Sequence, residues 1–133
     1  MESSTWPAAL RITASRALPL AEGYAKRWRF DLAVFTNLSP DHLKTHGTWE
    51  HYLASKAQLF VHLGPGRTAV LNAGDQHAML IDRAMPPDLL RRWFHAPTRG
   101  PVLCDPDLAA ASIDVSAAGT VVTLAPSPLA ERL

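Results

Sequence analysis

Cysteine is nearly missing from this 133-residue sequence: Cys104 is the only one, so the chain can form no internal disulfide. This is compatible with a reducing compartment, and we expect a cytoplasmic protein. The sequence also has no apolar run near the roughly 20 residues that a membrane-spanning helix needs. Its first residues, Met1-Glu2-Ser3-Ser4, do not begin a basic segment followed by an apolar stretch, so we expect a soluble protein without a secretory signal.

An excess of charge of either sign is missing as well. The 13 basic and 12 acidic residues leave a net charge of +1. Such a balance gives no broad field to attract nucleic acid or an anionic membrane, and we expect neither as a partner. The apolar fraction of 47% is ordinary for a globular domain, and a chain of this length can bury a core.

The middle of the chain alternates short apolar runs with helical patterns. Residues 31–36 and 68–72 are nearly continuous apolar runs, which is typical of strands covered on both faces. Residues 48–63 have apolar side chains at helical spacing, and residues 75–83 begin with an aspartate cap and predict a second helix. This strand-helix-strand-helix order predicts a βαβ unit and a mainly parallel sheet.

The flanking segments are less clearly patterned. We expect a short strand at residues 8–13, a short helix over 86–92 that begins at two prolines, and another strand at 102–104. Residues 112–124 contain two β-branched runs separated by small residues, which predicts a C-terminal β-hairpin.

One charged residue lies within the apolar stripe of the predicted long helix. Lys56 shares this stripe with Tyr52, Leu53, Leu59 and Phe60. One interpretation is that Lys56 extends along the edge of the stripe to water. The other is that its amine turns inward to a polar site, where burial lowers its pKa. A neutral amine can take up carbon dioxide, and the resulting carbamate would be a hard oxygen ligand for Mg²⁺.

Polar residues that suit such a site follow the first predicted strand. Asp41, His42 and His46 lie in the loop after it, and ligands of open α/β sheets bind at the carboxyl ends of strands. The two histidines can equally be structural, packing or capping the loop. A metal hydrolase that uses both histidines is a further possibility, although Pro40 and Gly47 leave little room for the helix it would need.

Residues 31–60 combine four short motifs, and in this combination they resemble the central domain of the Mur ligase family, in particular its UDP-N-acetylmuramoyl-tripeptide synthetase branch. The motifs are Thr36-Asn37-Leu38, Asp41-His42-Leu43, His46-Gly47, and a helix with the pattern Tyr52-x-x-x-Lys56-x-x-Leu59-Phe60. The resemblance implies a partial P-loop-type α/β domain with a family-like core over residues 31–127. It also implies that residues 1–133 form a single partial domain.

The resemblance further implies the activity and the roles of particular residues. The family uses ATP and Mg²⁺ to join an amino acid to the carboxylate of a UDP-linked muramyl peptide during peptidoglycan precursor synthesis. Lys56 matches a carbamylated lysine that helps to hold Mg²⁺, and His42 matches a histidine at the metal and phosphate site. Asn37 matches an asparagine that lines the same cleft. Asn72 and Asp75 match a segment near the adenine of ATP, although Asn72 is also an ordinary turn residue after a strand.

The sequence departs from the family pattern at several points. It contains no glycine-rich phosphate-binding loop ending in Gly-Lys-Thr or Gly-Lys-Ser. Arg11 stands near the place of a metal-binding glutamate, where a cation would oppose metal binding. Ser15 matches a substrate-contacting serine only weakly, and the C-terminal amino-acid-binding domain of the family has no counterpart.

These departures lead to two hypotheses. The first is a ligase fragment with little or no activity alone, whose missing parts either belong to a separate completing chain or have been lost from a remnant gene. The second is a non-catalytic binding or assembly module that retains the fold.

Overall fold

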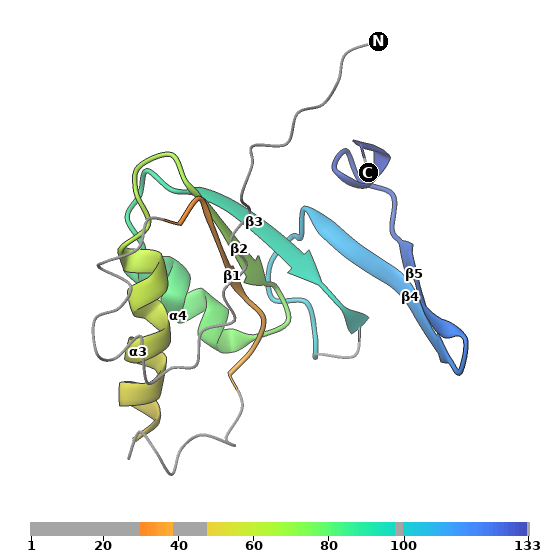
Figure 1. Ribbon diagram of the computed structural model, residues 1–133, viewed down its shortest axis with the longest axis horizontal. Coiled ribbons are helices and arrows are strands. Elements are labelled where there is room, and N and C mark those ends of the chain that lie inside the picture. The colour runs from red at the N-terminus through yellow and green to blue at the C-terminus, as the bar shows by residue number, and fades with distance from the viewer. Residues whose placement is uncertain (1–29, 39–47, 98–99, 133) are drawn as a thin grey trace.

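The computed structural model describes residues 30–38, 48–97 and 100–132 (Figure 1). The predicted strand at residues 8–13 lies outside the described residues, and so do Arg11, Ser15, His42 and His46. None of the helices in the described part is long and apolar enough to cross a membrane.

The described chain begins as the predicted alternation of strands and helices. In order these are β1 (Leu32–Phe35), α3 (Trp49–Val61), β2 (Thr68–Asn72), α4 (Gln76–Ala84) and β3 (Leu90–His95). The three strands lie side by side in chain order, and both neighbouring pairs are parallel. The predicted mainly parallel α/β sheet is therefore confirmed.

Both helices begin at side-chain caps that the sequence contains. Thr48 precedes α3, and its hydroxyl accepts a hydrogen bond from the backbone N–H of His51 at 3.2 Å. Asp75 precedes α4, and its carboxylate accepts from the N–H of His77 at 2.8 Å. Each cap satisfies a backbone donor that a helix start leaves without a partner. Gly66, with φ of 69°, lies in the turn between α3 and β2, in a conformation that glycine adopts without strain.

The two helices lie against one face of the sheet and contact each other (Figure 1). This follows from the topology, because two right-handed crossovers that step in the same direction place both helices on the same side. The core lies between the helices and the sheet, and its largest fully buried apolar side chains are those of Phe60, Leu71 and Ile81. On β1 the inward Ala33 and Phe35 are buried.

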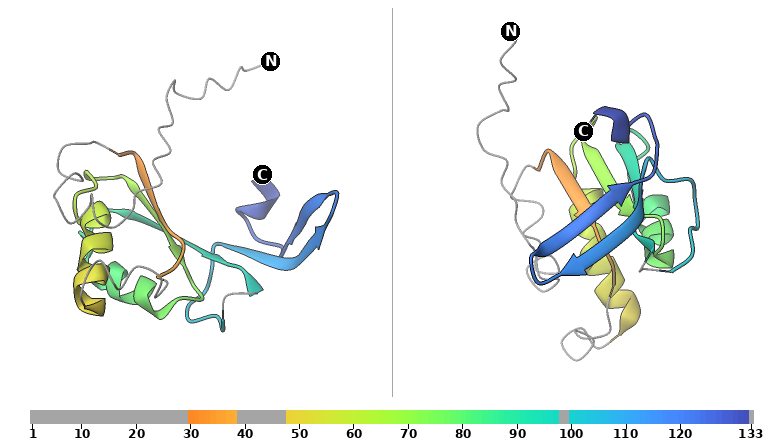
Figure 2. Two further views of the ribbon diagram at one scale, coloured as in Figure 1. Left: turned by 60° about the horizontal axis from the view of Figure 1, so that its bottom comes forward. Right: turned by 90° about the vertical axis from the view of Figure 1, so that its right-hand side faces the viewer.

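The sheet continues into a hairpin that extends beyond its layered part (Figure 2). β3 pairs in parallel with β4 (Leu108–Ser116), but only through Phe94 with Leu108 and His95 with Ala109. β4 then pairs antiparallel with β5 (Gly119–Leu124), and the short 3-10 helix η4 (Ala130–Arg132) follows. The predicted C-terminal hairpin is confirmed, with a longer first strand than the sequence pattern indicated.

Two predictions for the segment between α4 and the hairpin are wrong. The predicted helix over residues 86–92 is a turn followed by β3. Arg91 and Arg92 lie inside this strand and pair with β2, and their side chains donate to Asp82 at 2.6 Å and to Asp107 at 3.1 Å. The predicted strand at residues 102–104 is irregular chain, in which Leu103 donates one backbone hydrogen bond to Ala73 at 2.8 Å.

Candidate functional site

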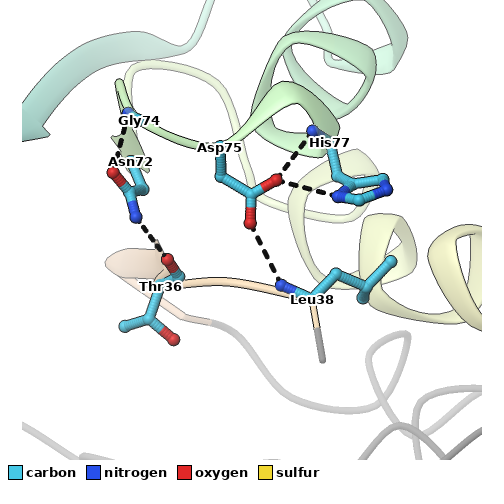
Figure 3. Close-up of polar contacts among 6 residues, drawn as sticks. All are labelled: Thr36, Leu38, Asn72, Gly74, Asp75 and His77. Carbon is cyan, nitrogen blue, oxygen red and sulfur yellow. Dashed lines mark hydrogen bonds and ion pairs between the residues drawn. The ribbon is translucent and has the colours of Figure 1, made fainter. Parts of the chain in front are cut away.

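The carboxyl ends of β1 and β2 are joined by the amide side chain of Asn72 (Figure 3). Its Nδ2 donates to the carbonyl oxygen of Thr36 at 2.7 Å, and its Oδ1 accepts from the N–H of Gly74 at 2.9 Å. Asn72 is only 1% exposed, so both ends of the amide have partners in an interior where an unpaired polar group is costly. The side chain therefore fixes the end of β1 to the turn after β2.

Asp75 makes a second connection between the same two segments. One carboxylate oxygen, Oδ2, accepts from the N–H of Leu38 at 3.2 Å. The other, Oδ1, accepts from the N–H of His77 and also lies 2.8 Å from His77 Nδ1. The carboxylate is 13% exposed and has contacts on both oxygens, so it acts as a helix cap and as an interstrand connection. Its family-implied position near adenine stays a prediction.

Asn37 lies between these two connections. On one side of it the amide of Asn72 donates to the carbonyl of Thr36. On the other side the carboxylate of Asp75 accepts from the N–H of Leu38. Asn37 itself is half-buried, and within the described part its side chain makes no hydrogen bond. An amide with a fixed backbone and no hydrogen-bond partner among the described residues is suited to contact a ligand.

His77 is a site residue that the sequence reading did not select. Its imidazole lies 2.8 Å from Asp75 and packs edge-on against Trp49, with ring centroids 5.2 Å apart. His77 and Trp49 line part of an open depression of about 390 Å³ between α3 and α4, where Glu50 and Gln76 add polar groups. In the sequence, the one feature that could have indicated a role for His77 is its place two positions after the helix-capping Asp75.

Lys56 is half-buried on α3, with Nζ 5.9 Å from the centroid of the Tyr52 ring. Burial lowers the pKa of its amine, because desolvation disfavours the charged form. A half-buried amine with a lowered pKa has a larger neutral fraction, which carbamate formation requires. Its proximity to His42 stays a prediction, since His42 lies outside the described residues.

A complete metal site is not formed by the described residues alone, since they contain no group of three or more His, Cys, Asp or Glu side chains placed to hold an ion. The carboxylate oxygens of Asp75 are also engaged by backbone and imidazole groups. Of the residues implied to hold Mg²⁺, the described part contains Lys56 alone. As a carbamate it would supply the oxygen donors that Mg²⁺ prefers.

Comparison with known proteins agrees with the resemblance carried by residues 31–60. The family model of the Mur ligase middle domain matches residues 13–125. The UDP-N-acetylmuramoyl-L-alanyl-D-glutamate–2,6-diaminopimelate ligase of Chlamydia pneumoniae is 36% identical over 109 residues, which are 81% of this chain and 21% of that ligase. The ligase of the same name from Halalkalibacterium halodurans is 51% identical over 59 residues, covering 42% of this chain and 12% of that ligase.

Among solved structures, a crystal structure of MurF from Acinetobacter baumannii matches with a TM-score of 0.58. The sequence identity is 16%, and the match covers 80% of this chain and 24% of that one. At this identity the likeness shows the fold alone. The chain thus spans about a fifth or less of the length of the two ligases named above.

Proposed function

This chain belongs to the Mur ligase family through its middle domain, and we propose that it forms part of the ATP- and Mg²⁺-binding centre of an acid–amino-acid ligase. The proposed reaction belongs to cytoplasmic peptidoglycan precursor synthesis. ATP transfers a phosphoryl group to the carboxylate of a UDP-linked muramyl peptide with release of ADP. The amine of the incoming amino acid then attacks the acyl phosphate, which forms the amide and releases phosphate and a proton. Catalysis of this kind depends on positioning of the reactants and on neutralisation of phosphate charge.

The fixed end of β1 is the observation that carries this proposal. Asn72 and Asp75 hold the chain on both sides of Asn37 and directly before residues 39–47, which contain His42. Ligands of parallel α/β sheets bind at the carboxyl ends of the strands, and this is where the two connections lie. A site whose backbone is fixed in advance needs little reorganisation when charge develops.

The lowered pKa of the Lys56 amine supports the proposed metal site. A neutral amine combines with carbon dioxide to give a carbamate and a proton, which replaces a cation by an anionic oxygen ligand. The lowered pKa of this half-buried lysine favours the neutral amine from which the carbamate forms. We propose that the Lys56 carbamate and His42 hold Mg²⁺ and that Asn37 contacts the bound ligand.

The sequence also gives a reason to expect weak activity. It has no Gly-Lys-Thr or Gly-Lys-Ser segment, so this chain lacks the loop whose backbone N–H groups and lysine bind phosphates in the family. We propose that these 133 residues have little or no ligase activity by themselves, because phosphate binding in the family needs that loop.

Titration calorimetry with Mg-ATP tests the proposal. We expect weak binding that Lys56→Ala abolishes and that Arg83→Gln, a change at an exposed arginine of α4, leaves intact. A second measurement is ¹³C NMR after equilibration with ¹³C-bicarbonate, in which a carbamate signal should appear and be absent from Lys56→Ala. Binding that is equal in wild type and Lys56→Ala would contradict the proposed site.

A non-catalytic binding or assembly module is the second candidate. The missing phosphate-binding loop favours it, and so does Arg11, which stands near the position of a metal-binding glutamate. No heat with Mg-ATP together with no carbamate signal would support this candidate over the first.

A further inference from the structure

His77 connects three elements that meet at the candidate site. Its Nδ1 lies 2.8 Å from Oδ1 of Asp75, whose Oδ2 accepts from the N–H of Leu38 at 3.2 Å (Figure 3). The imidazole also packs edge-on against Trp49, the first residue of α3, with ring centroids 5.2 Å apart. A continuous row of contacts therefore runs from the end of β1, through the start of α4, to the start of α3.

The carboxylate of Asp75 fixes the orientation of the imidazole. An ionised carboxylate only accepts hydrogen bonds, so Nδ1 of His77 carries the hydrogen and donates it to Asp75. Both side chains are 13% exposed, and Oδ1 also accepts from the backbone N–H of His77. Because two donors of one residue hold Oδ1, the other oxygen is directed toward Leu38. A turn of the carboxylate away from Leu38 would therefore weaken its bonds to His77 as well.

The cap of α4 does not require this imidazole. The backbone N–H of His77 completes the cap with Asp75, and every residue except proline would supply the same donor. The imidazole adds two further contacts, the bond from Nδ1 and the packing against Trp49. These two contacts connect α4 to the rest of the row, so the side chain has a role beyond helix capping.

The two ends of this row flank residues 39–47 in the sequence. Leu38 directly precedes this segment, and Trp49 follows it by two positions. The contacts of His77 therefore reach both flanks of a segment that contains His42. Fixing both ends of a segment lowers the number of conformations that are open to the residues between them.

We propose that His77 is a positioning residue for the Mg²⁺ site, an inference that rests on the function proposed above. His77 acts through other residues and not by contact with the metal or the nucleotide. It keeps the flanks of residues 39–47 at a fixed separation, which holds the imidazole of His42 within reach of an ion bound by the Lys56 carbamate. Loss of an outer hydrogen-bonded partner costs about 10–100-fold in affinity at metal sites.

Two substitutions each remove one half of this connection. His77→Asn keeps an N–H donor near the place of Nδ1 and removes the ring that packs against Trp49. His77→Phe keeps a ring and removes the donor to Asp75. His62→Phe is the matched control, because it makes the same change at an exposed histidine at the end of α3, whose ring is hydrogen-bonded to Gln58 at 3.0 Å.

Titration calorimetry with Mg-ATP measures the affinity of each variant at a temperature at which circular dichroism shows that all chains are folded. Both His77 variants should raise the dissociation constant about tenfold or more, and His62→Phe should leave it nearly unchanged. A role in stability alone predicts a lower urea midpoint with an unchanged dissociation constant. That result would overturn the positioning role and leave the proposed function intact.

NMR with saturating Mn²⁺-ATP shows which ligand is displaced, because this paramagnetic ion broadens the signals of nearby protons. In wild type the imidazole signals of His42 should broaden, and in both His77 variants they should broaden less. The ¹³C carbamate signal of Lys56 should persist in every variant. Loss of that signal in the His77 variants would mean that His77 acts on Lys56 and would overturn the assigned role. A wild-type chain that binds no Mg-ATP would refute the proposed function, and this inference with it.

Discussion

Replacement of Asp75 tests directly whether its carboxylate fixes the end of β1. In Asp75→Ala, helix α4 loses its N-cap, which costs about 1 kcal/mol. The N–H of Leu38, a residue only 8% exposed, also loses its acceptor, and a buried donor without a partner costs about 1–3 kcal/mol. The expected loss in free energy of unfolding is therefore about 2–4 kcal/mol, a large share of the about 5–15 kcal/mol typical of a domain.

Asp75→Asn separates the two contributions. Asparagine is as good a helix cap as aspartate, so the cap to His77 is kept. The amide then directs its NH₂ group toward the N–H of Leu38, and two donors cannot bond to each other. We expect Asp75→Asn to cost about 1 kcal/mol less than Asp75→Ala and still to be clearly destabilising.

Urea unfolding followed by tryptophan fluorescence measures both variants, with Asp88→Ala as the control. Asp88 is exposed and its side chain makes no hydrogen bond in the described part, so its replacement should change stability by less than about 0.5 kcal/mol. Native-state hydrogen exchange should show faster exchange at the Leu38 amide in both Asp75 variants. A wild-type exchange rate at Leu38 in Asp75→Asn would refute the assigned connection, even if the overall stability fell.

Three further predictions follow from the described contacts. Asn72→Ala should lower the free energy of unfolding by about 1–3 kcal/mol, since the N–H of Gly74 and the carbonyl of Thr36 both lose a partner, and urea unfolding would show it. Burial lowers the pKa of Lys56 in the folded chain, so the unfolded chain binds more protons between that pKa and the ordinary lysine value of 10.5. The stability of wild type relative to Lys56→Met should therefore rise with pH through this window, and a flat difference in urea midpoints would contradict it. Burial, and then the charges of nearby aspartates, raise the pKa of Cys104, so iodoacetamide should alkylate it more slowly in the folded chain than in urea.

The sequence alone was sufficient for the local elements near the candidate site. The apolar runs gave β1 and β2 nearly to the residue, and the capping Thr48 and Asp75 marked the starts of both helices. These elements were predictable because their signals, side-chain periodicity and a cap within three residues, act over short distances along the chain.

A helix was wrongly predicted in place of β3 because the residues that contact this strand lie in other elements of the chain. Two adjacent arginines after a pair of prolines do not indicate an inner strand, and a helix was the expectation. In the folded chain Arg91 pairs with Asp82 of α4, and the mostly exposed Arg92 pairs with Asp107, the residue before β4. The parallel pairing of β3 with β2 and these two ion pairs form only in the folded chain, so no local pattern indicates them.

The sequence by itself determined the family, the parallel order of the first elements and the identity of the residues at the strand ends. Only the tertiary structure decided what those residues do. Asn72 and Asp75 are 36 and 37 positions from Thr36 and Leu38, and their hydrogen bonds exist only after β1 and β2 pair in parallel. The physical reason is that a polar side chain takes its partner from whatever backbone group folding leaves buried beside it.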